Sequence, residues 1–111
     1  MIRRVYFRYL IPAITLLLVA VGNTPATLRQ AADRINLLVG AAVQPSLLLQ
    51  PAYSETLSRE FNMLEPEDAM KWRALRPDQA TFDFHGGDEI VRYAQTHRMK
   101  VRGHCLVWDH D

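Results

Sequence analysis

A dense group of polar side chains directly follows a short apolar run in this sequence. The group covers residues 65–72 and reads Glu-Pro-Glu-Asp-Ala-Met-Lys-Trp, so three carboxylates, an ammonium and an indole lie within eight residues. The run before it, residues 61–64, has the length of a short strand. In α/β folds ligands bind where strands end. Because carboxylates accept hydrogen bonds and an ammonium donates them, this stretch is a candidate site for a hydroxyl-rich ligand.

The same stretch also allows a purely structural interpretation. Pro66 suits the first turn of a helix, which would run over residues 66–75. Glu67 and Lys71 would then lie at i and i+4 and could form a surface ion pair worth under about 0.5 kcal/mol. Trp72 could be a core residue or a stacking surface. Spacing alone leaves both interpretations open.

A second candidate cluster lies at the end of a predicted strand over residues 99–108. Its last seven residues read Arg-Gly-His-Cys-Leu-Val-Trp, and the alternation of a strand would place His104 and Trp108 on the same face. A histidine in an apolar strand is often a hydrogen-bonded core residue. A Trp that arrives with it at the carboxyl end of the strand also fits a binding site, so both interpretations stay open for His104.

Metal binding is a further possibility at this end of the sequence. His104 is followed at residues 109–111 by Asp-His-Asp. Metal sites need ligands held in a fixed geometry, and four residues at one chain end do not supply evidence for it. No Gly-rich phosphate motif occurs either. We therefore predict no metal and no cofactor.

The elements that would position these clusters alternate between helix and strand. Thr24 and Pro25 favour a helix start as N-cap and first-turn residue. Tyr53, Leu57 and Phe61 recur every four residues, which predicts the buried face of another helix. The predicted helices cover residues 24–36, 51–61, 66–75 and 88–97; the predicted strands cover residues 37–44, 62–64 and 99–108, with an extended segment at 81–84 and a loop at 85–87. This alternation implies an α/β fold with parallel strands, and the apolar run at 37–44 predicts a strand buried on both faces.

Charge and composition narrow the function classes. The 111 residues carry a net charge of +1, but the first 22 hold three Arg and no acid, which leaves ten basic and twelve acidic residues in the remainder. A slightly acidic body argues against a nucleic-acid partner. The single cysteine, Cys105, cannot form an internal disulfide.

The N-terminal residues are typical of a secretory signal peptide. Residues 1–8 are basic, residues 9–21 are apolar but shorter than the roughly 20 residues that span a bilayer, and Ala-Val-Gly at 20–22 is a small-x-small pattern. We predict a signal peptide over residues 1–22, a secreted (extracellular or periplasmic) product without membrane association after cleavage, and a domain over residues 23–111. An uncleaved anchor or a buried apolar segment is the alternative.

Both clusters together resemble glycoside hydrolase family 10, the endo-1,4-β-xylanases. Residues 65–72 are similar to that family's T/E-P-E-N-x-M-K-W motif, and residues 102–108 are similar to its R-G-H-x-L-V-W motif. Weaker matches lie at residues 39–43, at residues 82–84 for F-x-F, and at residues 88–91 for A-D-x-I-V. The resemblance covers about residues 27–108, in order and at family-like spacing.

The resemblance implies a TIM (β/α)8 barrel that cleaves β-1,4-linked xylose chains with retention, of which this chain holds about the first three β/α units. Its partner would be xylan or a xylo-oligosaccharide. The residues that match substrate-binding positions of the family are Glu67, Asp68 and Lys71 on the glycone side, and His104 and Trp108 beside the scissile bond.

Two departures from the family pattern limit that comparison. Asp68 stands where the family usually has Asn, so a donor is lost and the carboxylate could pair with Lys71 instead. After Trp108 the family usually continues His-Asn/Ser-Gln, whereas this sequence has Asp109, His110 and Asp111, so nothing is inferred for those three positions.

The catalytic carboxylates are the missing part of the resemblance. Retaining hydrolysis needs two carboxyl groups about 5–5.5 Å apart, and in this family they follow the fourth and seventh strands. A barrel of this kind takes about 250 residues. We therefore expect an N-terminal part of a xylanase that carries binding residues but is inactive alone. A non-catalytic xylan-binding remnant, or a different barrel enzyme that shares the first strands, are the alternatives.

Overall fold

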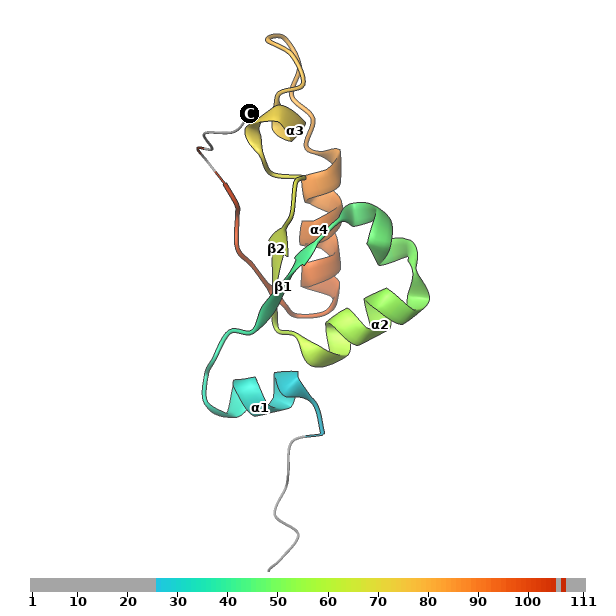
Figure 1. Cartoon of the computed structure of the whole chain (residues 1–111), viewed down its shortest axis with the longest axis vertical. Coiled ribbons are helices and arrows are strands. Elements are labelled where there is room, and N and C mark those ends of the chain that lie inside the picture. The colour runs from blue at the N-terminus through green and yellow to red at the C-terminus, as the bar shows by residue number, and fades with distance from the viewer. Residues whose placement is uncertain (1–25, 106, 108–111) are drawn as a thin grey trace, which may run out of the picture.

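The computed structural model describes residues 26–105 and 107. Three parallel strands form a sheet in the order β1-β2-β3, with helices packed against it (Figure 1). In chain order the elements are α1 (Leu28–Arg34), β1 (Gly40–Val43), the 3-10 helix η2 (Pro45–Leu49), α2 (Pro51–Glu60), β2 (Met63–Pro66), α3 (Trp72–Leu75), α4 (His85–Thr96) and β3 (Lys100–Val101). The parallel pairing of strands that alternate with helices confirms the α/β prediction.

The core lies between one face of this sheet and the helices α2 and α4. Val43, Leu64 and Ile90 are completely buried there, and Leu57 of α2 joins the same cluster. Tyr53 and Phe61 pack against it, which confirms the predicted four-residue spacing of the α2 face. Because successive side chains of a strand point to opposite faces, Met63 and Glu65 of β2 lie on the other face and are only partly buried.

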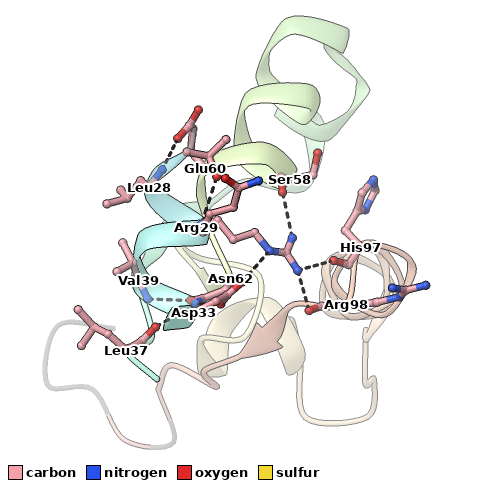
Figure 2. Close-up of polar contacts among 12 residues, drawn as sticks. Leu28, Arg29, Asp33, Leu37, Val39, Ser58, Glu60, Asn62, His97 and Arg98 are labelled. Atoms are coloured by element: carbon pink, nitrogen blue, oxygen red, sulfur yellow. Dashed lines mark hydrogen bonds and ion pairs between the residues drawn. The ribbon is translucent and has the colours of Figure 1, made fainter. Parts of the chain in front are cut away.

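Helix α1 closes the amino end of the sheet through polar contacts. Arg29 donates to the carbonyls of Ser58 at 2.9 Å, His97 at 3.0 Å and Arg98 at 3.1 Å, and Figure 2 shows its guanidinium between them. Asn62, which precedes β2, accepts from the Val39 amide at 2.8 Å and donates to Asp33 Oδ1 at 2.7 Å and to the Leu37 carbonyl at 2.9 Å. Arg29 of α1 thus joins the ends of α2 and α4, and Asn62 joins the start of β2 to α1 and to the segment that follows it.

The predicted first helix starts too early. Its N-cap is Thr27, whose Oγ1 accepts from the Gln30 amide at 3.1 Å. Thr24 and Pro25, the predicted start, lie outside the described residues. In a sequence, an N-cap is a short polar residue before the first helical turn. Thr24 and Thr27 both fit that description, so the sequence does not distinguish between them.

The first strand is shorter than predicted and not buried on both faces. Leu37 and Leu38 are 52% and 53% exposed, and the Leu37 amide donates to the Ala32 carbonyl in the turn that ends α1. The ladder therefore begins only at Gly40. A Cβ on Gly40 would lie 2.9 Å from the Met63 carbonyl oxygen, so a residue without a side chain is needed where β1 meets the start of β2.

The predicted helix over residues 66–75 is wrong, because Pro66 is the last residue of β2 and is buried. The Leu64 carbonyl accepts from Arg102 on the β3 side, and the Glu67 amide donates to Val43 on the β1 side. Alternation along the strand then points the missing N–H of Pro66 toward β3, beyond the last residue of that strand, so no ladder bond is lost. Residues 67–71 form turns, and only Trp72–Leu75 is helical.

The predicted loop at residues 85–87 is instead the first turn of α4, which begins at His85. A Cβ on Gly86 would lie 3.2 Å from the Ala69 Cβ, and one on Gly87 would lie 3.6 Å from Met70. The two glycines let the helix start approach the turn after β2. Their low helix propensity is outweighed by this packing.

The third predicted strand is also shorter, since β3 ends at Val101 and residues 102–105 are extended without ladder pairing. Within residues 26–105 and 107, no helix has the length and apolar character needed to cross a membrane. The predicted signal peptide over residues 1–22 lies outside the described part of the chain.

Candidate functional site

The polar residues singled out from the sequence gather at the carboxyl edge of the sheet. Glu67 and Asp68 follow β2, Lys71 immediately precedes α3, and His104 lies three residues beyond β3. Because β2 and β3 are parallel neighbours, both segments leave the sheet at the same edge. The structure therefore places four of the five predicted site residues at one edge, and the fifth, Trp108, lies outside the described residues.

Glu67 is anchored by its backbone and exposes its side chain. Its amide donates to the Val43 carbonyl at 3.0 Å, which ties the first residue after β2 to the end of β1. Burial raises the pKa of the Tyr53 hydroxyl, and the negative charge of Glu67 raises it further, with a smaller effect from Tyr93. The Glu67 carboxylate thus acts on α2 as well as facing solvent.

Lys71 pairs with Asp68, not with Glu67. Its Nζ lies 2.7 Å from Asp68 Oδ1, and its amide donates to the Asp68 carbonyl at 2.9 Å. The predicted i,i+4 pair between Glu67 and Lys71 is wrong because residues 67–71 form a turn rather than a helix. The turn instead brings the side chains of Asp68 and Lys71 together, which is the pairing that the departure of Asp68 from the family pattern allowed. The two carboxylates at this strand end can accept hydrogen bonds from sugar hydroxyls, and the ammonium can donate to sugar oxygens.

His104 is held from the side by Glu65 of β2. Its Nδ1 lies 3.9 Å from Glu65 Oε1, while Arg102 Nε lies 3.3 Å from Glu65 Oε2. Sequence reasoning noted Glu65 among the carboxylates but gave it no role. The signal was its position within a strand that neighbours the segment containing His104, which becomes visible only once the register is known.

An open pocket of about 490 Å³ adjoins this edge. It lies between α3, the start of α4 and the segment after β3, with an apolar wall that includes Trp72 and Phe84, and His104 also lines it. Trp72 is 60% exposed, and the Arg76 guanidinium lies 5.9 Å from its ring centroid. Trp72 is therefore not buried in the core of the described residues, which keeps it available as a surface for a ligand.

Metal ligation has no geometric basis in the part of the chain that the structure describes. No group of three or more His, Cys, Asp or Glu side chains comes together there in a way that could hold a metal ion. His104 faces a carboxylate and a guanidinium, which is a polar rather than a metal-binding environment. Asp109, His110 and Asp111 lie outside the described residues.

Comparison with known proteins identifies a family match over most of the chain. The family model for glycosyl hydrolase family 10 matches residues 27–111. The chain is 44% identical over 70 residues to a beta-1,4-xylanase from Dictyoglomus thermophilum, an alignment that covers 63% of this chain and 19% of the relative. It is 33% identical over 105 residues to endo-1,4-beta-xylanase B from Thermotoga neapolitana, covering 88% of this chain and 30% of the relative.

Solved structures give the same result in three dimensions. Xylanase 10B from Thermotoga petrophila RKU-1, solved in complex with xylobiose, superimposes with a TM-score of 0.71 and 31% identity, and the match covers 78% of this chain and 28% of that one. Xylanase B from Clostridium stercorarium F9 superimposes with a TM-score of 0.69 at 34% identity, covering 74% and 24%. The chain thus spans less than a third of the length of each of these relatives.

Proposed function

The chain belongs to glycosyl hydrolase family 10, and we propose that it forms the N-terminal part of a secreted endo-1,4-β-xylanase that hydrolyses xylan with retention of configuration. The observation that carries the proposal is the polar edge itself. Glu67, Asp68, Lys71 and His104 leave two adjacent parallel strands at the same end of the sheet, in a chain whose named relatives are xylanases.

The proposed architecture is a (β/α)8 barrel of which this chain supplies about the first three strand–helix units. Its three parallel strands carry α2 and α4 on one face, as the units of such a barrel do. Catalytic and binding residues in these barrels lie at the carboxyl ends of the strands, and residues at the opposite end support stability. The polar edge is at the carboxyl end, which agrees with a substrate cleft there.

In this proposal Glu67, Asp68 and Lys71 bind xylose units on the glycone side of the scissile bond. The exposed Glu67 carboxylate accepts hydrogen bonds from sugar hydroxyls, and the Lys71 ammonium donates to their oxygens. His104, together with Trp108, lines the subsite next to the bond that is cut. Asp68 modulates Lys71, because the two side chains form an ion pair at 2.7 Å.

The chemical step needs two carboxyl groups beyond this set. In retaining hydrolysis one carboxylate attacks the anomeric carbon to form a glycosyl-enzyme, while a carboxylic acid protonates the departing oxygen and later deprotonates the attacking water. We assign Glu67 and Asp68 to binding and place the acid/base and the nucleophile on later strands of the barrel. This chain would then hold and orient xylan without cleaving it.

The secreted part of the proposal rests on the N-terminal residues. The basic residues 1–8 and the apolar residues 9–21 support export of the chain. Removal of residues 1–22 would leave the family-matched region, residues 27–111, intact.

Affinity electrophoresis through a xylan-containing gel, together with a reducing-sugar assay, tests the proposal. We expect the chain to be retarded by xylan and to release no reducing sugar. Lys71→Ala should weaken the retardation about five-fold, the equivalent of one solvent-exposed hydrogen bond of about 1 kcal/mol. Lys100→Ala is the matched control, because Lys100 is the exposed first residue of β3 at the opposite end of the sheet.

The outcomes separate the alternatives. Absence of retardation, or an equal effect of both substitutions, would contradict the assigned binding edge. Release of reducing sugar by the chain itself would show that the catalytic carboxylates are not on later strands. Tight retardation that no edge substitution weakens would favour a xylan-binding module with a different surface.

A further inference from the structure

Glu65 occupies a position that the proposed binding roles do not use. It lies in β2 between Leu64 and Pro66, which are both buried on the helix-covered side of the sheet. The pleat therefore directs Glu65 to the opposite face of the sheet, two residues before Glu67 in the chain. Its side chain is 29% exposed, so a charged group is partly withdrawn from solvent directly beneath the polar edge.

The two oxygens of this carboxylate contact two different residues of the neighbouring segment. Oε2 lies 3.3 Å from Arg102 Nε, and Oε1 lies 3.9 Å from His104 Nδ1. The backbone pairing between β2 and this segment ends where the Arg102 amide donates to the Leu64 carbonyl at 2.8 Å. Beyond that bond, the Glu65 side chain contacts both Arg102 and His104 from β2.

We propose that Glu65 is a positioning residue, which holds Arg102 and His104 so that the His104 imidazole is presented to a xylose unit in a fixed orientation. The inference rests on the proposed function, since it concerns the affinity of that same edge for xylo-oligosaccharides. Glu65 itself touches no sugar in this proposal.

The chemistry of the contact explains why a carboxylate suits this position. At 3.9 Å the Glu65 carboxylate lies beyond hydrogen-bond distance of His104 Nδ1 and acts on that side of the ring through its negative charge. A neutral side chain at position 65 would lack this attraction. Arg102 contacts the other oxygen of the same carboxylate at 3.3 Å, which orients the Glu65 side chain toward the segment after β3.

Glu65→Gln tests the role, because glutamine keeps the shape of the side chain and removes its charge. Two measurements on the full chain are needed: the nitrogen-15 chemical shifts of the His104 ring and of Arg102 Nε, recorded without sugar, and the affinity for xylotriose by NMR titration. We expect both sets of shifts to change and the dissociation constant for xylotriose to rise about five-fold, in the range of one lost hydrogen bond.

Glu55→Gln is the matched control, since Glu55 is exposed on α2 and the substitution is chemically identical. It should leave the shifts and the affinity unchanged. A thermal melt of each variant records whether the fold is retained. If Glu65→Gln unfolds the chain, Arg102→Gln and the His104 ring shifts in that variant provide the same comparison from the other side of the ion pair.

Each outcome decides between the inference and the function on which it rests. Unchanged ring shifts in Glu65→Gln would overturn the contact, and changed shifts with unchanged xylotriose affinity would overturn the positioning role while leaving the proposed function intact. If the unmodified chain binds no xylotriose, the proposed function fails, and the role of Glu65 in presenting His104 to a sugar fails with it.

Discussion

The two ends of the sheet use polar side chains in different ways. At the amino end, Arg29 and Asn62 bond mainly to backbone groups, and the Arg29 contacts join residues up to 69 positions apart in the sequence (Figure 2). At the carboxyl end, the contacts join charged side chains to each other, as in the pairs of Lys71 with Asp68 and of Glu65 with Arg102. The first arrangement fixes the chain, and the second can be exchanged for a ligand.

Physical chemistry explains why the amino end is fixed. The last carbonyls of a helix have no partner within the helix, and they carry the negative end of its dipole. Ser58 lies in the last turn of α2, and His97 and Arg98 follow α4, so one guanidinium serves the ends of two helices. Breaking these contacts would expose partly buried carbonyls without providing another protein donor.

At the carboxyl end, by contrast, the polar contacts contribute little to the stability of the fold. Exposed ion pairs contribute only about 0–1 kcal/mol because water and salt screen them. Asp68 is 62% exposed in its pair with Lys71, so a sugar hydroxyl can replace one partner at little cost to the fold. The comparison predicts that substitutions at the amino end change stability and leave sugar binding unchanged, and that substitutions at the carboxyl end do the reverse.

The largest effect is expected for Arg29→Ala. The loss of three donated bonds should lower the free energy of unfolding by about 2 kcal/mol, measured by amide hydrogen exchange of α1 and by urea unfolding. Arg34→Ala is the control, because Arg34 is exposed in the same helix and should cost under about 0.5 kcal/mol. The affinity for xylotriose per folded molecule should stay unchanged, and a five-fold loss in Arg29→Ala would break the distinction between the two ends.

A smaller effect of the opposite kind is expected for Asp68→Asn. The amide removes the charge that attracts Lys71 and restores a donor, so the xylotriose affinity should rise about two- to three-fold, the equivalent of an exposed ion pair of about 0.5 kcal/mol. The unfolding free energy should change by less than about 1 kcal/mol. High salt provides the control, because screening should reduce the difference between the two proteins. A loss of affinity would contradict the prediction and would show that sugar binding needs the negative charge of Asp68.

The parallel pairing of the strands could be predicted from the sequence because apolar runs of strand length alternate with helical patterns along the chain. The buried face of α2 could be predicted because Tyr53, Leu57 and Phe61 recur every four residues. The start of α4 could not be predicted, because two consecutive glycines are typical of a loop. Only the close approach of Gly86 to Ala69 and of Gly87 to Met70 shows why the helix has glycines there.

The site shows a similar division. The position of Glu67, Asp68, Lys71 and His104 at one edge of the sheet could be predicted because they directly follow apolar runs of strand length. Helical spacing suggested Glu67 as the Lys71 partner, whereas the departure of Asp68 from the family pattern allowed the Asp68 pair that the structure shows. Spacing could not decide, since a helix and a turn place different side chains together and Pro66 signals either. The Glu65 contact needs the register of β2 against β3, and short strands leave that register undetermined in a sequence.

The smallest effect is expected for Glu67→Gln, which tests whether the Glu67 carboxylate acts on Tyr53 of α2. Glu67→Gln should lower the pKa of Tyr53 part of the way toward its usual value of 10.0, since burial, the larger cause of the upward shift, remains. A pKa raised in the folded state means that stability is present below the unfolded value and is lost as the pH rises through the folded value. The unmodified chain should therefore lose more stability above pH 10 than Glu67→Gln does. A carbon-13 titration of the Tyr53 ring measures the pKa, with Tyr53→Phe for assignment and Glu55→Gln as the charge control. An equal pKa in both carboxylate variants would mean that the Glu67 charge does not reach Tyr53, and the action of the carboxyl end on the first turn of α2 would then be lost from the comparison.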